Sequence, residues 1–138
     1  MMKKAIMYSI TIVISATIIL TVGVPHHISE SAAAELACEY FNYRMDDPEI
    51  TIKSYSVWRE YARTSIDDQT GDSYIQMEQR DQVGLLTKIY DYWNPNFKNY
   101  SVYIEADMGS GREGAFTIKV DAYTSFVFDG MEEISWRR

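Results

Sequence analysis

Cysteine is almost absent from this chain, since Cys38 is the only one among its 138 residues. A single cysteine cannot form an intrachain disulfide, so we expect packing alone to hold the folded domain together. A lone thiol on the inner face of a helix is most often a small buried hydrophobic residue, and we assign that role to Cys38.

Histidine is also scarce, because only His26 and His27 occur. Both follow an uncharged N-terminal run, and we place them in a loop before the folded domain. That placement leaves the domain without a histidine for a catalytic triad, a Cys-His pair or a typical catalytic zinc site. We therefore predict no catalytic residue, no metal and no cofactor.

Positive charge is limited to 13 Lys and Arg residues against 20 Asp and Glu residues, which gives a net charge of −7. Removing Lys3 and Lys4 with the N-terminal segment lowers the charge of the remainder to −9. So acidic a surface repels phosphate backbones and anionic membrane faces. We predict no nucleic-acid partner.

The N-terminus reads as a membrane-targeting segment. Residues 5–24 hold no charged side chain, follow Lys3 and Lys4, and end at Pro25. About twenty such residues span roughly 30 Å as a helix, which is the thickness of the hydrocarbon layer. We predict that residues 1–24 are a signal peptide or membrane anchor, with the N-terminus in the cytoplasm and the remainder on the outer face of the membrane or secreted.

The stretch SESAAAELAC, residues 29–38, has three possible interpretations: a signal-peptidase site, a lipoprotein signal or the first turns of a helix. Glu35 stands where a lipoprotein signal needs leucine, which disfavours the second reading. The other two stay open, with Ser31 as the expected helix N-cap. We assign residues 25–34 to a linker with a cleavage region and residues 35–138 to one extracytoplasmic domain.

Helical spacing of apolar residues dominates the middle of the chain. It predicts a helix over residues 31–47, and a second helix that Ser54 or Ser56 caps and that carries Val57, Trp58, Tyr61 and Ala62. The longest predicted helix covers residues 74–93 and ends at Asn94-Pro95.

The C-terminal part alternates with period two instead. Residues 100–106 and 116–128 alternate apolar and polar side chains around a turn at residues 109–114, which predicts an antiparallel hairpin, and a short segment follows at 133–136. The fold class is therefore α+β, with helices packed on one face of a curved antiparallel sheet. If a C-terminal strand is missing, the open edge at 115–128 favours a homodimer through the sheet edge.

Acidic and glycine-rich motifs give weak signals. Asp67, Asp68 and Asp72 lack the ligand spacing of a calcium loop, and the GSGREG turn at 109–114 lacks the lysine of a phosphate-binding loop. Spacing does not single out any pair among Asp91, Asp107 and Asp121 for acid-base work.

Aromatic residues are the one abundant feature, with 11 Tyr and 3 Trp. They are ordinary core residues of a small domain, and they are also the residues that line ligand pockets. If a ligand pocket exists, our candidates for its lining are Tyr40, Trp58, Trp93, Tyr103 and Phe126.

Three segments resemble a known family. They are ELACEYFNYRMDD, YIQMEQRDQVGLL and NYSVYIEADMGSGREGAFTIKVDAYTSFVFDG, which together span about residues 35–130. Their order is similar to the cone-shaped, nuclear-transport-factor-two-like (SnoaL-like) domains that precede amidase domains in exported Gram-positive proteins. Two features depart from that family: the chain ends where another long strand is usual, and no amidase region follows. The resemblance implies an α+β fold and an exported location, and it carries over no site residue.

We therefore expect a non-enzymatic accessory or binding domain of the bacterial cell envelope, whose partner is an envelope protein or a small ligand. Residues 5–24 would hold it to the membrane if they are not cleaved. Two alternatives stay open. One is a minimal enzyme that uses Asp107 or Asp121 in an aromatic cavity, and the other is a membrane-tethered assembly or regulatory subunit, which would expose an apolar patch.

Overall fold

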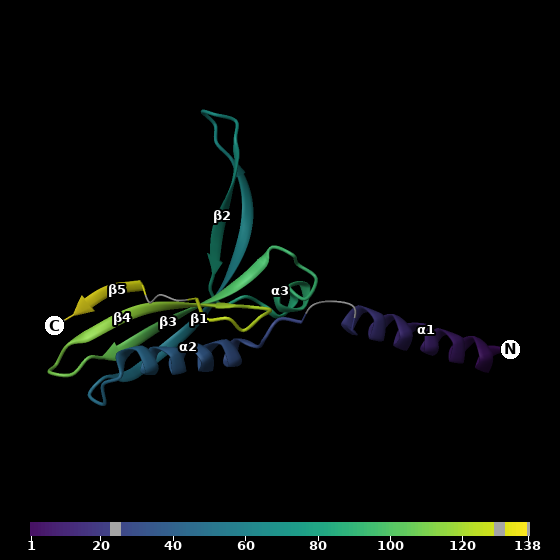
Figure 1. Cartoon of the computed structure of the whole chain (residues 1–138). Coiled ribbons are helices and arrows are strands. Elements are labelled where there is room, and N and C mark those ends of the chain that lie inside the picture. The colour runs from purple at the N-terminus through teal and green to yellow at the C-terminus, as the bar shows by residue number, and fades with distance from the viewer. Residues whose placement is uncertain (23–25, 129–131, 138) are drawn as a thin grey trace.

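The chain folds as an α+β domain preceded by a separate helix (Figure 1). This computed structural model describes residues 1–22, 26–128 and 132–137, with side chains for 1–18 and 26–128. The elements in chain order are α1 (Met2–Val22), α2 (Glu30–Met45), β1 (Thr51–Ile66), β2 (Ser73–Arg80), α3 (Leu85–Tyr90), β3 (Phe97–Asp107), β4 (Glu113–Asp121) and β5 (Glu132–Arg137).

The strands form one antiparallel sheet in the order β2-β1-β3-β4-β5. The β3–β4 hairpin predicted from the alternating pattern is confirmed, with Val102 opposite Ile118 near its centre. The expected open edge at residues 115–128 is wrong, because β5 pairs with β4 there and Val120 bridges to Val127. Within the described residues, the outer edges of the sheet are β2 and β5.

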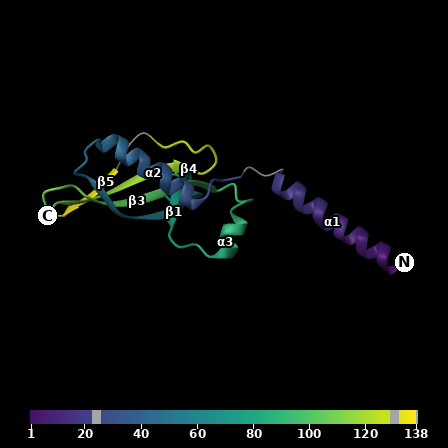
Figure 2. The same ribbon diagram turned by 90° about the horizontal axis from the view of Figure 1, so that it is seen from below.

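The core lies between α2 and one face of β3 and β4 (Figure 2). Ala33, Ala37 and Phe41 recur at helical spacing on α2 and are fully buried. They meet the inward side chains of the sheet, which are Tyr100, Val102, Ile104, Ala106, Phe116, Ile118 and Val120. Ser29, and not Ser31, caps α2, since the backbone N–H of Ala32 donates to its hydroxyl at 3.1 Å.

Two predicted helices are wrong. Residues 51–66, expected to contain the second helix, form strand β1, which is rich in the β-branched and aromatic residues that favour strands. Residues 74–93, expected to be the longest helix, divide into β2, a turn and the six-residue helix α3. The apolar residues at helical spacing belong to several elements: in β1 they are partly or fully buried, and in residues 74–93 they are divided among β2, the following turn and α3. Their spacing therefore did not mark one buried helix face.

The outer part of the β1–β2 hairpin projects away from the domain (Figure 1). β1 pairs with β3 only as far as Tyr61, and beyond that residue it pairs with β2 alone. We call residues 62–77 the arm, and residues 59–61 with 78–80 its base. Because α2 covers a different part of the sheet, the arm is a two-stranded ribbon without a second layer.

Helix α1 lies apart from the sheet in Figure 1. Its described side chains, residues 1–18, are all exposed and mostly apolar. Among the described residues, no helix combines the length and the apolar character that a membrane crossing requires.

Candidate functional site

A buried ion pair lies at the base of the arm. Arg59 Nη1 donates to Asp91 Oδ2 at 2.6 Å, and the Tyr61 hydroxyl donates to the same oxygen at 2.6 Å. Asp91 is fully buried and Arg59 is 4 % exposed. Since Asp91 follows α3 directly, these bonds tie the α3 turn to the strand from which the arm extends.

Arg59 also joins two further elements to this cluster. Its Nε donates to Glu30 Oε1 at 3.1 Å, where α2 begins, and Lys88 Nζ lies 3.7 Å from the same oxygen. The guanidinium stands over the rings of Phe97 and Tyr100 in β3, at 4.9 and 5.6 Å from their centroids. One arginine therefore holds together β1, β3, α2 and the segment after α3.

The pKa values of the side chains in this cluster indicate a structural role. Burial lowers the pKa of Arg59, but its interactions with Tyr100, Asp91 and Glu30 outweigh burial and raise that pKa overall. Burial also raises the pKa values of Tyr61 and Tyr100 well above the ordinary value of a phenol. Arg59 is therefore charged and both phenols are protonated at neutral pH, so none of the three exchanges a proton there.

His27 belongs to the folded domain, which corrects the expectation that both histidines lie before it. The backbone N–H of Ile28 donates to the carbonyl of Ala122 at 2.7 Å and fixes this segment against the sheet. The His27 ring lies 4.8 Å from the ring of Tyr92 and 5.1 Å from that of Phe97. Among the described side chains, His27 Nε2 and Asp91 Oδ1 are the buried polar atoms without a hydrogen-bond partner.

Two clefts flank the buried pair. One has a volume of about 660 Å³ and lies between the base of the arm and α3, where it is lined by Tyr61, Arg63, Glu78, Arg80, Leu86, Tyr90 and Asp91, among others. The other has a volume of about 410 Å³ and is lined by Glu30, Val57, Arg59, Arg80, Asp81 and Lys88, among others. Charged, polar and apolar side chains are mixed in both, which is typical of surfaces that contact proteins.

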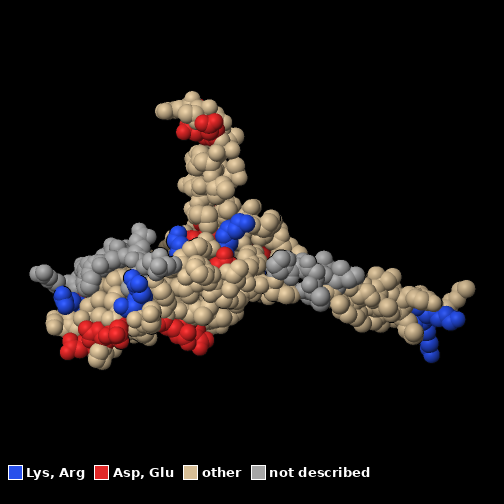
Figure 3. Space-filling model, in the orientation of Figure 1, with Lys and Arg blue, Asp and Glu red and all other residues tan. Residues whose placement is uncertain are grey.

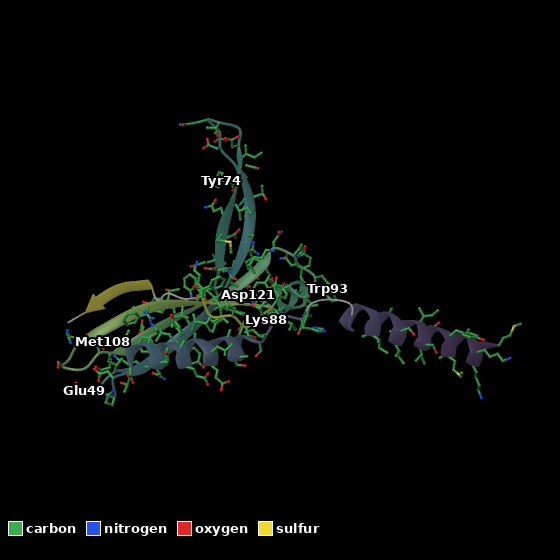
Figure 4. The ribbon with its side chains drawn as sticks, in the orientation of Figure 1. Glu49, Tyr74, Lys88, Trp93, Met108 and Asp121 are labelled. Carbon is green, nitrogen blue, oxygen red and sulfur yellow. The ribbon has the colours of Figure 1, made fainter. Side chains whose placement is uncertain are left out.

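The arm carries apolar side chains into solvent. Ile75 is 73 % exposed, and Ile66, Tyr74 and Met77 are also exposed; Figure 4 shows Tyr74 on the arm, far from the packed part of the sheet. Helix α3, across the larger cleft, exposes a second apolar group: Leu85, Leu86, Ile89 and Tyr90. Monomeric proteins rarely leave so many neighbouring apolar residues uncovered unless they bind something there.

Charge is distributed unevenly along the same ribbon. Figure 3 shows acidic residues at the tip of the arm and both basic and acidic residues around its base. The tip contains Asp67, Asp68 and Asp72, and the base contains Arg80, whose guanidinium stacks on the Tyr61 ring at 4.8 Å. Asp67 Oδ1 accepts the backbone N–H groups of Gln69 and Thr70, so this carboxylate shapes the turn at the tip.

The structure does not bring the five pocket candidates together. Tyr40 lies on α2 and packs against the core, whereas the sheet register places Trp58 and Tyr103 on the opposite face. Trp93 follows α3, and Phe126 is exposed after β4, against Phe128. Tyr103 lines a third, small cleft of about 50 Å³. The other four candidates line neither this cleft nor the two larger ones.

The other candidate carboxylates have local roles. Asp107 Oδ1 accepts the N–H of Gly109 at 3.0 Å. Asp121 Oδ1 accepts the N–H groups of Tyr123 and Thr124 at 2.9 and 2.8 Å. Partial burial raises the pKa of Asp121, but these hydrogen bonds outweigh it and lower that pKa overall, which is opposite to the rise that the enzyme alternative requires. Within the described residues, no group of three or more His, Cys, Asp or Glu side chains could hold a metal ion.

Sequence reasoning missed the pair of Arg59 and Asp91, because its members are 32 residues apart and belong to segments predicted as helices. The only local signal was an arginine inside the apolar and aromatic run VWREYA. Comparisons of the chain with family models, with curated proteins and with solved structures give no match.

Proposed function

We propose that the chain is a non-enzymatic accessory domain of the bacterial cell envelope that binds a protein partner through the arm. The observation that carries this proposal is the exposure of Ile66, Tyr74, Ile75 and Met77 on a ribbon whose β2 edge is free. An isolated two-stranded hairpin is marginally stable in water, so a ribbon of this kind gains stability from a partner. This is the exposed patch that the assembly-subunit alternative requires.

The minimal-enzyme alternative has less support. Its two carboxylates, Asp107 and Asp121, hold backbone turns, and the pKa of Asp121 is lowered. The buried carboxylate of Asp91 is paired with Arg59 and with a Tyr61 phenol whose pKa is raised. These pairings favour a supporting role over proton transfer.

The proposed location is the outer face of the cytoplasmic membrane, and it depends on the sequence of residues 1–24. Of the two possible fates of that segment, retention as an anchor is favoured by packing. A cut at Ala33 or Ala34 would divide α2 inside the buried core and would remove the Ser29 cap and the Ile28 hydrogen bond to Ala122. The family resemblance, with its cone-like fold, stays a prediction beside this proposal.

The partner-binding role can be tested by photo-crosslinking in the native cells. Tyr74 on the arm and Tyr55 on β1 are 49 % and 56 % exposed, so they form a matched pair. Each is replaced in turn by a photoreactive phenylalanine analogue in the full chain. We expect an adduct with a protein from position 74 and none from position 55. Adducts from both positions, or from neither, would contradict the proposal.

Location is tested by the intact mass and membrane partitioning of the protein from the same cells. We expect the full-length mass in the membrane fraction. A soluble chain that begins within residues 32–35 would contradict retention.

A further inference from the structure

We propose that the partner of the arm is a second copy of this chain, paired antiparallel through the free edges of the two β2 strands with a two-fold axis at Gln76. This inference rests on the proposed function, because it takes the arm as the contact surface. It goes further by naming the occupant and the register. Backbone hydrogen bonding, side-chain complementarity and the absence of blocking residues each support it.

Backbone hydrogen bonds near the arm show which groups of β2 point away from β1. Asp67 N–H donates to the carbonyl of Asp72 at 2.9 Å, so residue 72 directs its backbone groups toward β1. Ala62 N–H donates to the carbonyl of Asn96, on the side of β1 away from β2. Residue 62 therefore faces away from β2 while residue 67 faces it, so the alternation of β1 agrees with that of β2. Because successive residues of a strand point to opposite sides, the outward groups of β2 belong to Ser73, Ile75, Met77 and Gln79.

Only one two-fold register pairs all four of these residues with each other. An antiparallel axis at Gln76 places Ile75 opposite Met77 of the second copy and Ser73 opposite Gln79. Moving the axis by half a residue, to a point between two residues, pairs outward groups with inward ones. Moving it by a whole residue places Gln79 or Ser73 opposite a residue beyond the end of β2.

The side chains match in this register on both faces of the ribbon. On one face, Ile75 and Met77 of each copy form a group of four apolar side chains that are exposed in the single chain. On the other face, Asp72 lies opposite Arg80 of the second copy. Antiparallel pairing therefore brings an acidic residue from the tip of each arm next to an arginine at the base of the other, and these opposite charges favour the pairing.

The edge of β2 also lacks the residues that commonly prevent pairing. Ser73–Arg80 contains no proline and no lysine, and both are frequent on edges that must stay free. Its two charged side chains, Glu78 and Arg80, form an ion pair with each other at 3.1 Å. The antiparallel arrangement leaves the two domains at opposite ends of a four-stranded ribbon, where neither covers the other's arm.

Cysteine crosslinking tests this register on the full chain in a Cys38→Ala background. The axis places the two Gln76 residues directly opposite each other, as a non-hydrogen-bonded pair with Cα atoms about 4.5 Å apart, which a disulfide can bridge. We expect Gln76→Cys to give a covalent dimer under mild oxidation. Tyr74→Cys is the matched control, because the two copies of position 74 would be about 14 Å apart along the ribbon and outside disulfide reach.

A double variant extends the test, since position 74 should face position 78. Tyr74→Cys with Glu78→Cys should crosslink where Tyr74→Cys alone does not. No covalent dimer from Gln76→Cys, or equal crosslinking from Gln76→Cys and Tyr74→Cys, would overturn the register and the inference. The photo-adduct at position 74 separates the two proposals: an adduct with a different protein leaves the proposed function standing and overturns the second copy, and the absence of any adduct overturns both.

Discussion

The β3–β4 hairpin and the arm are built from the same local chemistry and differ in what surrounds them. Each turn is shaped by an aspartate, since Asp107 Oδ1 accepts the N–H of Gly109 and Asp67 Oδ1 accepts that of Gln69. Each also has a glycine at positive φ, 79° at Gly109 and 75° at Gly71. Yet β4 buries alternate side chains under α2, whereas nearly every residue of β2 is exposed.

This difference teaches that hairpin formation and hairpin burial are separate properties of the chain. Turn residues and β-propensity favour both ribbons. Burial needs a second layer, and α2 supplies one to β3 and β4 but not to the arm. We therefore expect the free energy of unfolding to depend on the covered hairpin, and association to depend on the arm.

The largest effect on stability should come from the layer that covers β3 and β4. Phe41 is fully buried, with its ring centroid 5.3 Å from that of Phe116. Phe41→Ala should lower the free energy of unfolding by about 3 to 5 kcal/mol, because it removes contacts and leaves a cavity. Denaturant unfolding of the dilute protein measures this. Tyr74→Ala on the arm is the aromatic control and should change the free energy of unfolding by less than about 0.5 kcal/mol. Equal losses from both variants would contradict the difference between the two regions.

A second large effect should come from the base of the arm, where the two regions join. Arg59→Ala leaves Asp91 buried without its cation, and a broken buried pair typically costs about 3 to 5 kcal/mol. We expect the lower part of that range here, because Tyr61 keeps its hydrogen bond to Asp91.

Arg63→Ala is the matched control for Arg59→Ala, since Arg63 is an exposed arginine on the same strand. It should leave denaturant unfolding nearly unchanged, as most surface substitutions do. If Arg59→Ala were as mild as Arg63→Ala, the buried pair would not be what secures the arm to the domain.

The smallest effect should be electrostatic and confined to the covered region. The pKa of Asp121 is lowered in the folded state from its ordinary value of 3.8, so its charge stabilises the fold above that value, and the contribution is lost as the pH falls through the lower, folded pKa. Asp121→Asn should cost on the order of 1 kcal/mol or less at neutral pH. The difference from wild type should shrink below about pH 4. A difference that is constant down to pH 2 would contradict this assignment.

Prediction from the sequence succeeded where one face of a strand is buried. Val102, Ile104, Ile118 and Val120 alternate because α2 covers their side of the sheet, and that alternation identified the hairpin. In the arm both faces meet solvent, so no alternation was imposed there. Just before the arm, Val57, Trp58 and Tyr61 are at least partly buried on β1, and their spacing resembled that of a helix.

The candidate site could not be predicted from sequence patterns, for a different reason. Arg59 and Asp91 meet only through the tertiary fold, and neither stands in a motif that marks a buried ion pair. His27 was misplaced because its contacts with Tyr92 and Phe97 depend on the docking of Ile28 against the sheet. Long-range contacts of this kind leave no local periodicity.

Residue-resolved amide hydrogen exchange on the full chain, at low and high protein concentration, tests the central claim most directly. In dilute solution, the outward amides of Ser73, Ile75, Met77 and Gln79 should exchange rapidly, while the amides of β4 are protected. At high concentration those four amides should become protected, and β4 should not change. Protection of all of β2 at low concentration, or rapid exchange of the four amides at every concentration, would contradict the account.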